Sequence, residues 1–321
     1  MTPTLTLESV LPALPEIYLA IAVCVVLLVD VFVGRAATRV TPTLTLLVLA
    51  AGAGLLLAFA QVPSTVELFS GMYVTDPLAN LLKLLAMLFV AVSLLYSRHY
   101  LETRGLLKGE YYVLVLTALL GIFVMISAGS LLTMYIGVEL LALSLYALVA
   151  FDRDNGVAAE SAMKYFVLGA IASGCLLYGM SLVYGLGGSL LFSELAVALQ
   201  GPASLGLIMG VVFLVVGVAF KFGAVPFHMW VPDVYHGAPS SVTLFVATAP
   251  KIASFALAFR LLAGGLEGIS ETWTQMLAIV AVLSALVGNV VAIAQTNLKR
   301  MLAYSAVGNV GFILLGFVAG T

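Results

Sequence analysis

The sequence predicts an all-α, polytopic membrane protein, on the evidence of its composition and of its repeated apolar runs. Of its 321 residues, 63% are hydrophobic and only 9% are charged, and the mean hydropathy is +1.19. This composition excludes a soluble globular protein. A helix that crosses the bilayer requires about 20 mostly apolar residues. Ten runs meet this requirement, near residues 14–33, 42–60, 77–96, 111–127, 130–150, 159–184, 204–222, 240–263, 272–294 and 300–319.

The first run is predicted to be a retained helix rather than a cleaved signal. The residues before it and at its start include Glu8 and Glu16 but no lysine or arginine, and no small-residue cleavage site is evident. Positive charges gather in alternate loops, at Arg35 and Arg39, at Arg98, Arg104 and Lys108, at Arg153, and at Lys299 and Arg300. By the positive-inside rule these loops face the cytoplasm and the N-terminus faces out, which predicts a multi-pass protein of the inner (cytoplasmic) membrane.

The sequence offers little for a cofactor, a metal ion or a nucleic acid. Cys24 and Cys175 lie within apolar runs, where a thiol behaves as a small hydrophobe. The three histidines form no i, i+4 ligand pair. No glycine-rich phosphate loop follows a strand, and no basic face suits a nucleic acid. We therefore expect no cofactor, no metal and no nucleic-acid partner, and we expect the chemistry to occur in the membrane.

Four ionisable residues within the predicted spans form a short list of candidates at depth: Glu139, Lys164, Lys221 and Lys251. On the insertion scale, each costs about 2.5–3.5 kcal/mol at the centre of a helix. We therefore expect these groups to face one another or water. Glu139 lies near the middle of its span, where the alternative to a functional role is an ion pair between helices. Lys164 lies about one turn inside the cytoplasmic end, so snorkelling to the interface is an alternative.

Two further charges are given structural interpretations. Lys83 follows Asp76 by seven residues and shares its helix face two turns on. We expect Lys83 to snorkel or to pair locally. Arg260 lies close to the outer end of its span, and we interpret it as an anchor.

The stretch FKFGAVPFHMWVPDVYHG, residues 220–237, predicts a broken helix beside Lys221. The helical pattern from Leu205 to Gly237 covers 33 residues, or roughly 50 Å, which is too long for one straight span. Gly223 permits a turn, and Pro226 removes a backbone donor. We predict that residues 222–225 lack regular helical hydrogen bonds and that the helix resumes near Pro226. Because backbone groups at this depth need cover, we expect the break to be hydrated.

Lysine beside a helix defect suits proton transfer. Desolvation lowers the pKa of a lysine and a nearby carboxylate raises it, so a mobile counter-charge can switch the group. Lys251 follows Pro250 directly and repeats the combination of a lysine with a defect. We expect Glu139 and Lys221 to approach each other. A solute carrier usually adds polar side chains for its solute, whereas the neighbourhood of these lysines offers mainly Ser, Thr and Gly, so the proton interpretation is favoured.

Two segments carry a family resemblance. PFHMWVPDVYHGAPSSVTLFVATAPKIA, which follows Lys221, and QTNLKRMLAYSAVGNVGFILLG, residues 295–316, resemble the antiporter-like membrane subunits of respiratory complex I, the proton-translocating NADH:quinone oxidoreductase. Within that family, HMWVPDVY and ATAPKIA are most similar to the subunit N (subunit 2) branch. The resemblance covers most of the chain from about residue 76 onward.

The resemblance implies two inverted five-helix repeats, each with a broken helix, and a proton path along a central polar axis. In that pattern Glu139, Lys164, Lys221 and Lys251 match the helix-five glutamate and the lysines of helices six, seven and eight. His228 lies in the PFH motif and either contacts a water chain or packs with Trp230 at the interface. NADH, FMN, iron-sulfur clusters and quinone would belong to the other membrane and peripheral subunits of the complex.

The implied domains are an N-terminal three-helix segment, residues 1–109, a first repeat, residues 110–263, and the start of a second, residues 264–321. The second broken helix of the family is missing, so we expect a fragment or a naturally short form. The rival interpretations are a subunit of a multisubunit cation:proton antiporter or of a membrane-bound hydrogenase, and a purely structural membrane subunit.

Overall fold

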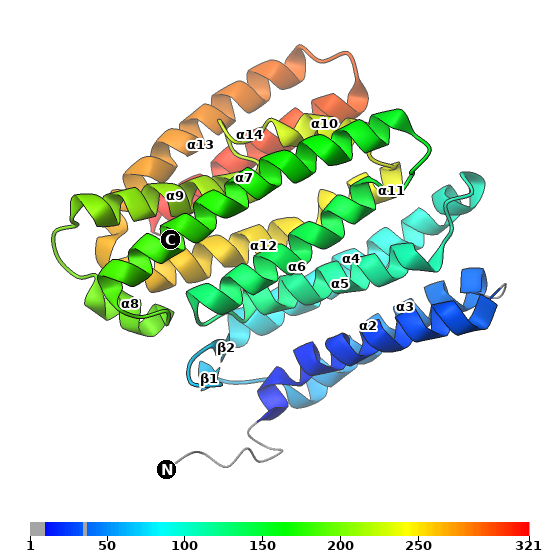
Figure 1. Cartoon of the computed structure of the whole chain (residues 1–321), viewed down its shortest axis with the longest axis horizontal. Coiled ribbons are helices and arrows are strands. Elements are labelled where there is room, and N and C mark those ends of the chain that lie inside the picture. Colours follow the sequence, from blue (N-terminus) through cyan, green and yellow to red (C-terminus); the bar gives the residue numbers. More distant parts are fainter. Residues whose placement is uncertain (1–9, 35–36, 321) are drawn as a thin grey trace. The chain divides into compact units, whose positions relative to one another are not determined.

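The computed structural model describes residues 10–34 and 37–320 (Figure 1). Glu8 and Arg35, which contribute to the predicted charge pattern, lie outside these ranges. Among the described residues, ten helices are long and apolar enough to cross a membrane, which confirms the predicted fold class and span count. The chain divides into two compact units, Met1–Leu148 with Leu244–Ala253 and Val149–Thr243 with Ser254–Thr321.

The first unit is built from antiparallel apolar helices. Its helices are η1 (Leu11–Ala13), α2 (Leu14–Val33), α3 (Ala37–Phe59), α4 (Pro77–Thr103), α5 (Gly109–Ile126) and α6 (Leu131–Val149). Both α2 and α4 pack against α3 and α5. A side chain at Gly137 of α6 would meet the backbone nitrogen of Met125 at 2.8 Å, so α5 and α6 cross with their backbones almost in contact.

A short hairpin, which the sequence does not predict, joins α3 to α4. Strands β1 (Val66–Leu68) and β2 (Tyr73–Thr75) pair antiparallel, with Glu67 opposite Val74. The hairpin also pairs with the segment that follows α5, because the Val74 N–H donates to the Ser127 carbonyl at 2.8 Å and the Gly129 N–H to the Met72 carbonyl at 3.0 Å. These bonds place Tyr73 and Ser127 side by side.

The second unit contains the predicted broken helix. Its elements are α7 (Gly156–Gly187), α8 (Phe192–Ala198), α9 (Leu205–Phe222), α10 (Trp230–Gly237), the π-helix η3 (Phe259–Gly265), the 3₁₀ turn η4 (Glu267–Ile269), α13 (Ser270–Ile293) and α14 (Leu298–Ala319). Helix α7 packs against α9, and α10 packs against α7 and α14. Helices α13 and α14 form an antiparallel pair (Figure 1).

Two short helices include residues of both units, α11 (Ser240–Val246) and α12 (Ala249–Ala258). Together with η3 they make up the predicted span at residues 240–263. The helix is interrupted at Ala247 and Thr248, directly before Pro250. The predicted defect beside Lys251 is therefore confirmed.

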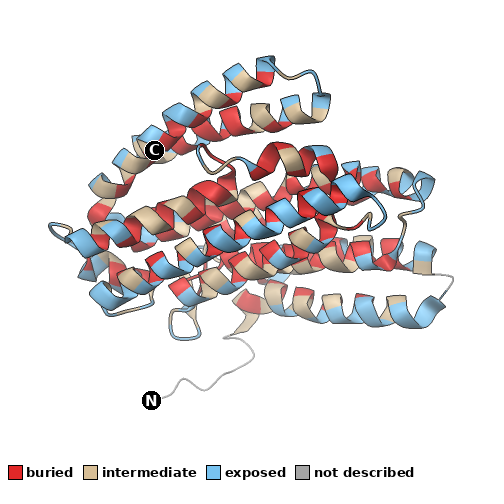
Figure 2. Cartoon of the chain, turned by 45° about the horizontal axis from the view of Figure 1, so that its top comes forward, coloured by how far each residue is buried: buried red, intermediate tan, exposed pale blue. Residues whose placement is uncertain are grey.

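Burial follows the expectation for a membrane protein. Figure 2 shows buried residues on the facing sides of α13 and α14 and exposed residues on their far sides. Many of the exposed residues are large and apolar, including Val290 and Ile293 of α13 and Phe312 of α14. Such a surface requires lipid or a partner protein rather than water.

Candidate functional site

The interruption of α9 leaves Lys221 in the last turn of a helix that ends inside an apolar run. Gly223, the residue after the helix, has φ 74° and ψ 36°, a left-handed conformation that suits glycine. The N–H groups of Gly223 and Ala224 donate back to Phe220 and Ala219, which closes the helix end. The predicted break is confirmed at Gly223, Ala224 and Val225, whereas Phe222, predicted to lie in the break, is the last residue of α9.

The prediction that the helix resumes near Pro226 is wrong. Residues 225–229 form turns, the Val225–Pro226 peptide bond is cis, and α10 begins at Trp230. The residue before a proline is sterically disfavoured in the helical region, and proline has no N–H to donate. The first N–H to donate back across a turn is that of Val231, which bonds the His228 carbonyl at 2.9 Å.

Side chains of the second unit cover the backbone groups released by the break. The Trp230 indole Nε1–H donates to the Phe220 carbonyl at 3.0 Å, and the Ser254 hydroxyl donates to the Lys221 carbonyl at 3.0 Å. The N–H of Val225 donates to the Ser284 hydroxyl oxygen at 2.8 Å, in a fully buried position. Protein side chains thus cover backbone groups at the break, and the hydration of the break stays a prediction.

Trp230 fixes the break against α7 and α9. Its ring stacks on Tyr165 of α7, with ring centroids 4.7 Å apart and planes at 20°. It also contacts the Phe220 ring of α9 at 5.7 Å. Stacking and the indole hydrogen bond together leave the side chain one orientation, so the end of α9 is held from two directions.

Asp233 of α10 is the centre of an ion network that the sequence did not reveal. Its carboxylate contacts the Lys164 Nζ at 3.2 Å and an Arg300 guanidinium nitrogen at 3.4 Å. Lys164 also pairs with Glu160, one turn earlier on α7, at 2.8 Å. The Asp233 carbonyl accepts a hydrogen bond from Ser161 at 3.0 Å. The network ties α7, α10 and α14 together at one end.

Lys164 does not lie buried among apolar helices as its position in the sequence suggests. Its side chain is 47% exposed, while those of Asp233 and Arg300 are 27% and 37% exposed. The cause is its place in the third turn of α7, where a long side chain reaches the helix end and finds carboxylates. The geometry agrees with the snorkelling alternative, with the addition of two carboxylate partners.

His228 lies in the connection between α9 and α10 and is half-buried. Burial lowers the pKa of this imidazole, and the nearby Pro226 carbonyl opposes the effect in part. Its ring lies edge-on to Tyr304 of α14, with centroids 6.0 Å apart. Trp230, the predicted packing partner, stacks on Tyr165 instead. Contact of His228 with a water chain stays a prediction.

The other two candidates lie in the first unit and are half-buried. Glu139 lies near the middle of α6, and Tyr146 lies two turns later on the same helix. Lys251 lies in the first turn of α12, where its N–H donates to the Thr248 carbonyl at 3.0 Å. The expected approach of Glu139 to Lys221 would join residues of the two units and stays a prediction.

Lys83 neither snorkels nor pairs with Asp76. Asp76 caps α4 by accepting the Ala79 N–H at 2.7 Å, so its carboxylate is engaged locally. The Lys83 side chain is 0% exposed and pairs with Glu16 of α2 at 2.6 Å. The two residues are 67 positions apart, so local spacing could not predict the pair. The only sequence signal for a distant partner was the presence of a lysine within an apolar run.

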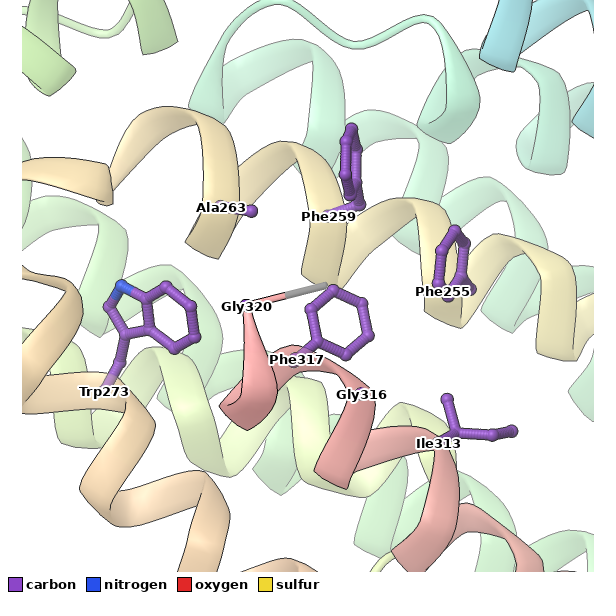
Figure 3. Close-up of a pocket in the computed structure, with 8 residues that line it drawn as sticks. All are labelled: Phe255, Phe259, Ala263, Trp273, Ile313, Gly316, Phe317 and Gly320. Atoms are coloured by element: carbon purple, nitrogen blue, oxygen red, sulfur yellow. The ribbon is translucent and has the colours of Figure 1, made fainter.

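The second unit also contains an apolar cavity of about 280 Å³ between η3, α13 and α14 (Figure 3). It is lined by Phe255, Phe259, Ala263, Trp273, Ile313, Gly316, Phe317 and Gly320. The indole N–H of Trp273 is already donated to the Leu266 carbonyl at 2.9 Å. The lining presents no ionisable side chain.

Lys221 and Lys251 lie at helix ends of opposite polarity. Among the described residues, no group of three or more His, Cys, Asp or Glu side chains could hold a metal ion. Lys221 lies at the carboxyl end of a helix, where the unpaired carbonyls favour a positive charge. Lys251 lies at the amino end of α12, where the partial positive charge of the helix end disfavours an ammonium. Two lysines in opposite fields suit reversible protonation.

The family model and the named relatives that match the chain indicate the same family. Residues 128–321 match the family model described as "NADH:quinone oxidoreductase/Mrp antiporter, TM". Proteins named NADH-quinone oxidoreductase subunit N are similar to the chain: that of Thiobacillus denitrificans is 54% identical over 100% of the chain and 67% of its own length. That of Thioalkalivibrio sulfidiphilus is 52% identical over 99% and 67%.

Solved structures show the same fold. A chain of respiratory complex I from Thermus thermophilus matches with a TM-score of 0.78 and 34% identity, over 96% of this chain and 65% of that one. A chain of the Mrp complex from Dietzia matches with a TM-score of 0.81 and 23% identity, over 98% and 59%, which shows the fold alone. The chain spans about two thirds of the length of the relatives it matches. It belongs to the NADH:quinone oxidoreductase/Mrp antiporter family of membrane subunits, and its named relatives group it with subunit N of NADH-quinone oxidoreductase.

Proposed function

We propose that this chain is a proton-translocating membrane subunit of a NADH:quinone oxidoreductase. Protons pass through Glu139, Lys164, Lys221 and Lys251, with His228 in contact with the water chain. NADH oxidation, FMN, iron-sulfur clusters and quinone reduction belong to partner subunits, and this chain contributes no redox site. The N-terminus faces out, and the domain division at residues 109 and 263 belongs to the same proposal.

One observation carries the proposal: Lys221 lies in the last turn of a helix that ends within an apolar run, and neighbouring side chains rather than a continued helix satisfy its backbone. A break built in this way is costly, since each uncovered polar group in hydrocarbon costs several kcal/mol. Discontinuous helices of this kind are typical of ion-coupled transporters. The ammonium of Lys221 gives its proton to water or to a carboxylate and takes one back, with no covalent intermediate.

The test is proton pumping in membrane vesicles that contain the assembled complex. We expect Lys221→Met and Glu139→Gln to lower NADH-driven pumping at least about tenfold, because removal of a proton-transfer group typically costs a factor of 10² or more. NADH oxidation with an uncoupler present should fall much less. Lys108→Met, at an exposed lysine in the loop before α5, is the control. Unchanged pumping in both variants would contradict the proposal.

The alternative is a subunit of a cation:proton antiporter, a function that the printed family description also includes. The relatives at 52–54% identity are named NADH-quinone oxidoreductase subunit N, whereas the Mrp chain is 23% identical. The same vesicles separate the two functions. Collapse of an imposed Na⁺ gradient without NADH, lost in Lys221→Met, would favour the antiporter.

A further inference from the structure

The first unit holds a second cluster of ionisable side chains, apart from the candidates of the proposed proton path. Glu16 lies in the first turn of α2, and Lys83 lies in the second turn of α4. The Lys83 Nζ contacts the Glu16 Oε1 at 2.6 Å and donates to the Tyr73 hydroxyl at 3.1 Å. The Tyr73 hydroxyl donates to the Glu16 Oε2 at 3.0 Å. Ser127 donates to the Glu16 Oε1 at 2.9 Å.

The three ionisable groups form a closed ring of hydrogen bonds. A proton can pass from Lys83 to Glu16 directly, or through Tyr73, which accepts one proton on its oxygen as it gives its own to the carboxylate. In both routes one N–H bond breaks and one carboxyl O–H bond forms. Burial and the charge of Glu16 raise the pKa of the Tyr73 hydroxyl, so Tyr73 stays protonated and acts as a relay.

Each group of the cluster has a partner in both protonation states of Glu16. The Tyr73 hydroxyl has a second acceptor in the Pro12 carbonyl at 2.9 Å, so it can turn there when Glu16 is neutral. The ammonium of Lys83 lies 5.4 Å and 5.9 Å from the ring centroids of Tyr73 and Phe123. These rings attract the cation without a carboxylate charge. Protonation of Glu16 therefore leaves no group of the ring unpaired.

The two charged groups of the ring differ in their exposure. Lys83 is 0% exposed, whereas the Glu16 side chain is 12% exposed at the start of α2. Asp76, which caps α4, and Glu67, on β1, are further acidic groups at this end. Asp30, Arg39 and Glu110 lie at the opposite ends of α2, α3 and α5, roughly 20 Å or more away along the helices.

A purely structural ion pair does not by itself explain why the pair is closed into a ring with the hydroxyl of Tyr73. Burial of two charges costs more than their attraction returns unless the geometry is excellent, and a well-packed apolar pair is often at least as stable. The ring supplies that geometry, and it consists of groups that exchange protons. We propose that Glu16, Tyr73 and Lys83 form a proton-exchange site, at which Glu16 takes up a proton from the water at the side of the membrane where α2 begins.

The test is pH-dependent infrared difference spectroscopy of the full chain in lipid nanodiscs, which detects the protonated carboxyl directly and does not depend on the proposed pumping function. We expect a carboxyl band that rises as the pH falls and is absent in Glu16→Gln. Lys83→Met should move the midpoint to higher pH, because the carboxylate loses its cation. Tyr73→Phe should move it in the same direction by about one pH unit, because the carboxylate loses one donor.

Glu67→Gln is the control, since Glu67 lies exposed on β1 of the same hairpin. It should leave the Glu16 band unchanged. If Glu16→Gln fails to fold, Lys83→Arg keeps the charge and should retain a titrating band, while Glu16→Gln with Lys83→Met restores neutrality and should lack it. A Glu16 carboxylate that stays ionised at every pH at which the chain is folded would overturn the proposal and leave a fixed ion pair. Equal midpoints in the parent, Lys83→Met and Tyr73→Phe chains would overturn it too.

Discussion

Ser284→Ala should destabilise the second unit by removing the partner of a buried backbone donor. The Ser284 hydroxyl accepts the Val225 N–H at 2.8 Å and donates to the Val280 carbonyl of its own helix at 2.6 Å. A buried donor without a partner costs about 1–3 kcal/mol. That cost is a shift of roughly 5-fold to 150-fold in the unfolding equilibrium. The measurement is unfolding of the chain in mixed micelles by titration with dodecyl sulfate, followed by the fluorescence of its two tryptophans.

Ser144→Ala is the matched control. Ser144 of α6 is also buried and donates to the carbonyl four residues earlier, that of Leu140, at 2.8 Å. Both variants lose this bond within the helix, so the difference between them isolates the orphaned Val225 N–H. Equal destabilisation by Ser284→Ala and Ser144→Ala would refute the argument that side chains cover the break.

Two further predictions concern Asp233 of α10 and His228 in the connection between α9 and α10. Asp233→Asn should lower the free energy of unfolding by no more than about 1 kcal/mol, because its partners Lys164 and Arg300 are substantially exposed. A double-mutant cycle with Lys164→Met measures the coupling energy of the pair. A coupling energy well above about 1 kcal/mol would contradict the inference that solvent screens this ion pair. The pKa of His228 is lowered by burial, so the unfolded chain binds more protons between that pKa and about 6.5, and stability should fall as the pH drops through this interval. His228→Gln should abolish this part of the pH dependence, which is measured by unfolding in micelles at several pH values. The same dependence of the free energy of unfolding on pH in the variant and the parent would count against the prediction.

Composition and local chemistry predicted the fold class and the break. Apolar runs bounded by charged or Gly-rich loops gave the spans, since each must bury its length in lipid. Length alone would have misled, because α7 runs unbroken for 32 residues, nearly the 33 residues from Leu205 to Gly237 that predicted a break. The difference is Gly223 and Pro226, which release the helix, whereas α7 contains no proline.

Pairings between distant segments could not be predicted. Glu16 reads as an acidic residue at the start of the first span, and Lys83 reads as a lysine on the same helix face as Asp76, two turns on. Their contact depends on the hairpin that carries Tyr73, whose strands of three residues are too short to show an alternating pattern. Asp233 was likewise hidden within the HMWVPDVY motif, because its partners come from α7 and α14.

The structure also gives a physical reason for a lysine at each defect. A helix that ends within the bilayer presents carbonyls equivalent to roughly half a negative charge at its carboxyl end and half a positive charge at its amino end. Lys221 occupies the last turn of α9, and Lys251 occupies the first turn of α12, the third residue after Thr248. An ammonium is favoured at the first position and disfavoured at the second, by about 0.3–1 kcal/mol each at exposed helix ends and by up to ~2 kcal/mol where the end is partly buried. A continuous helix would offer neither field, so each defect places its lysine in a helix-end field, and the two fields are of opposite sign.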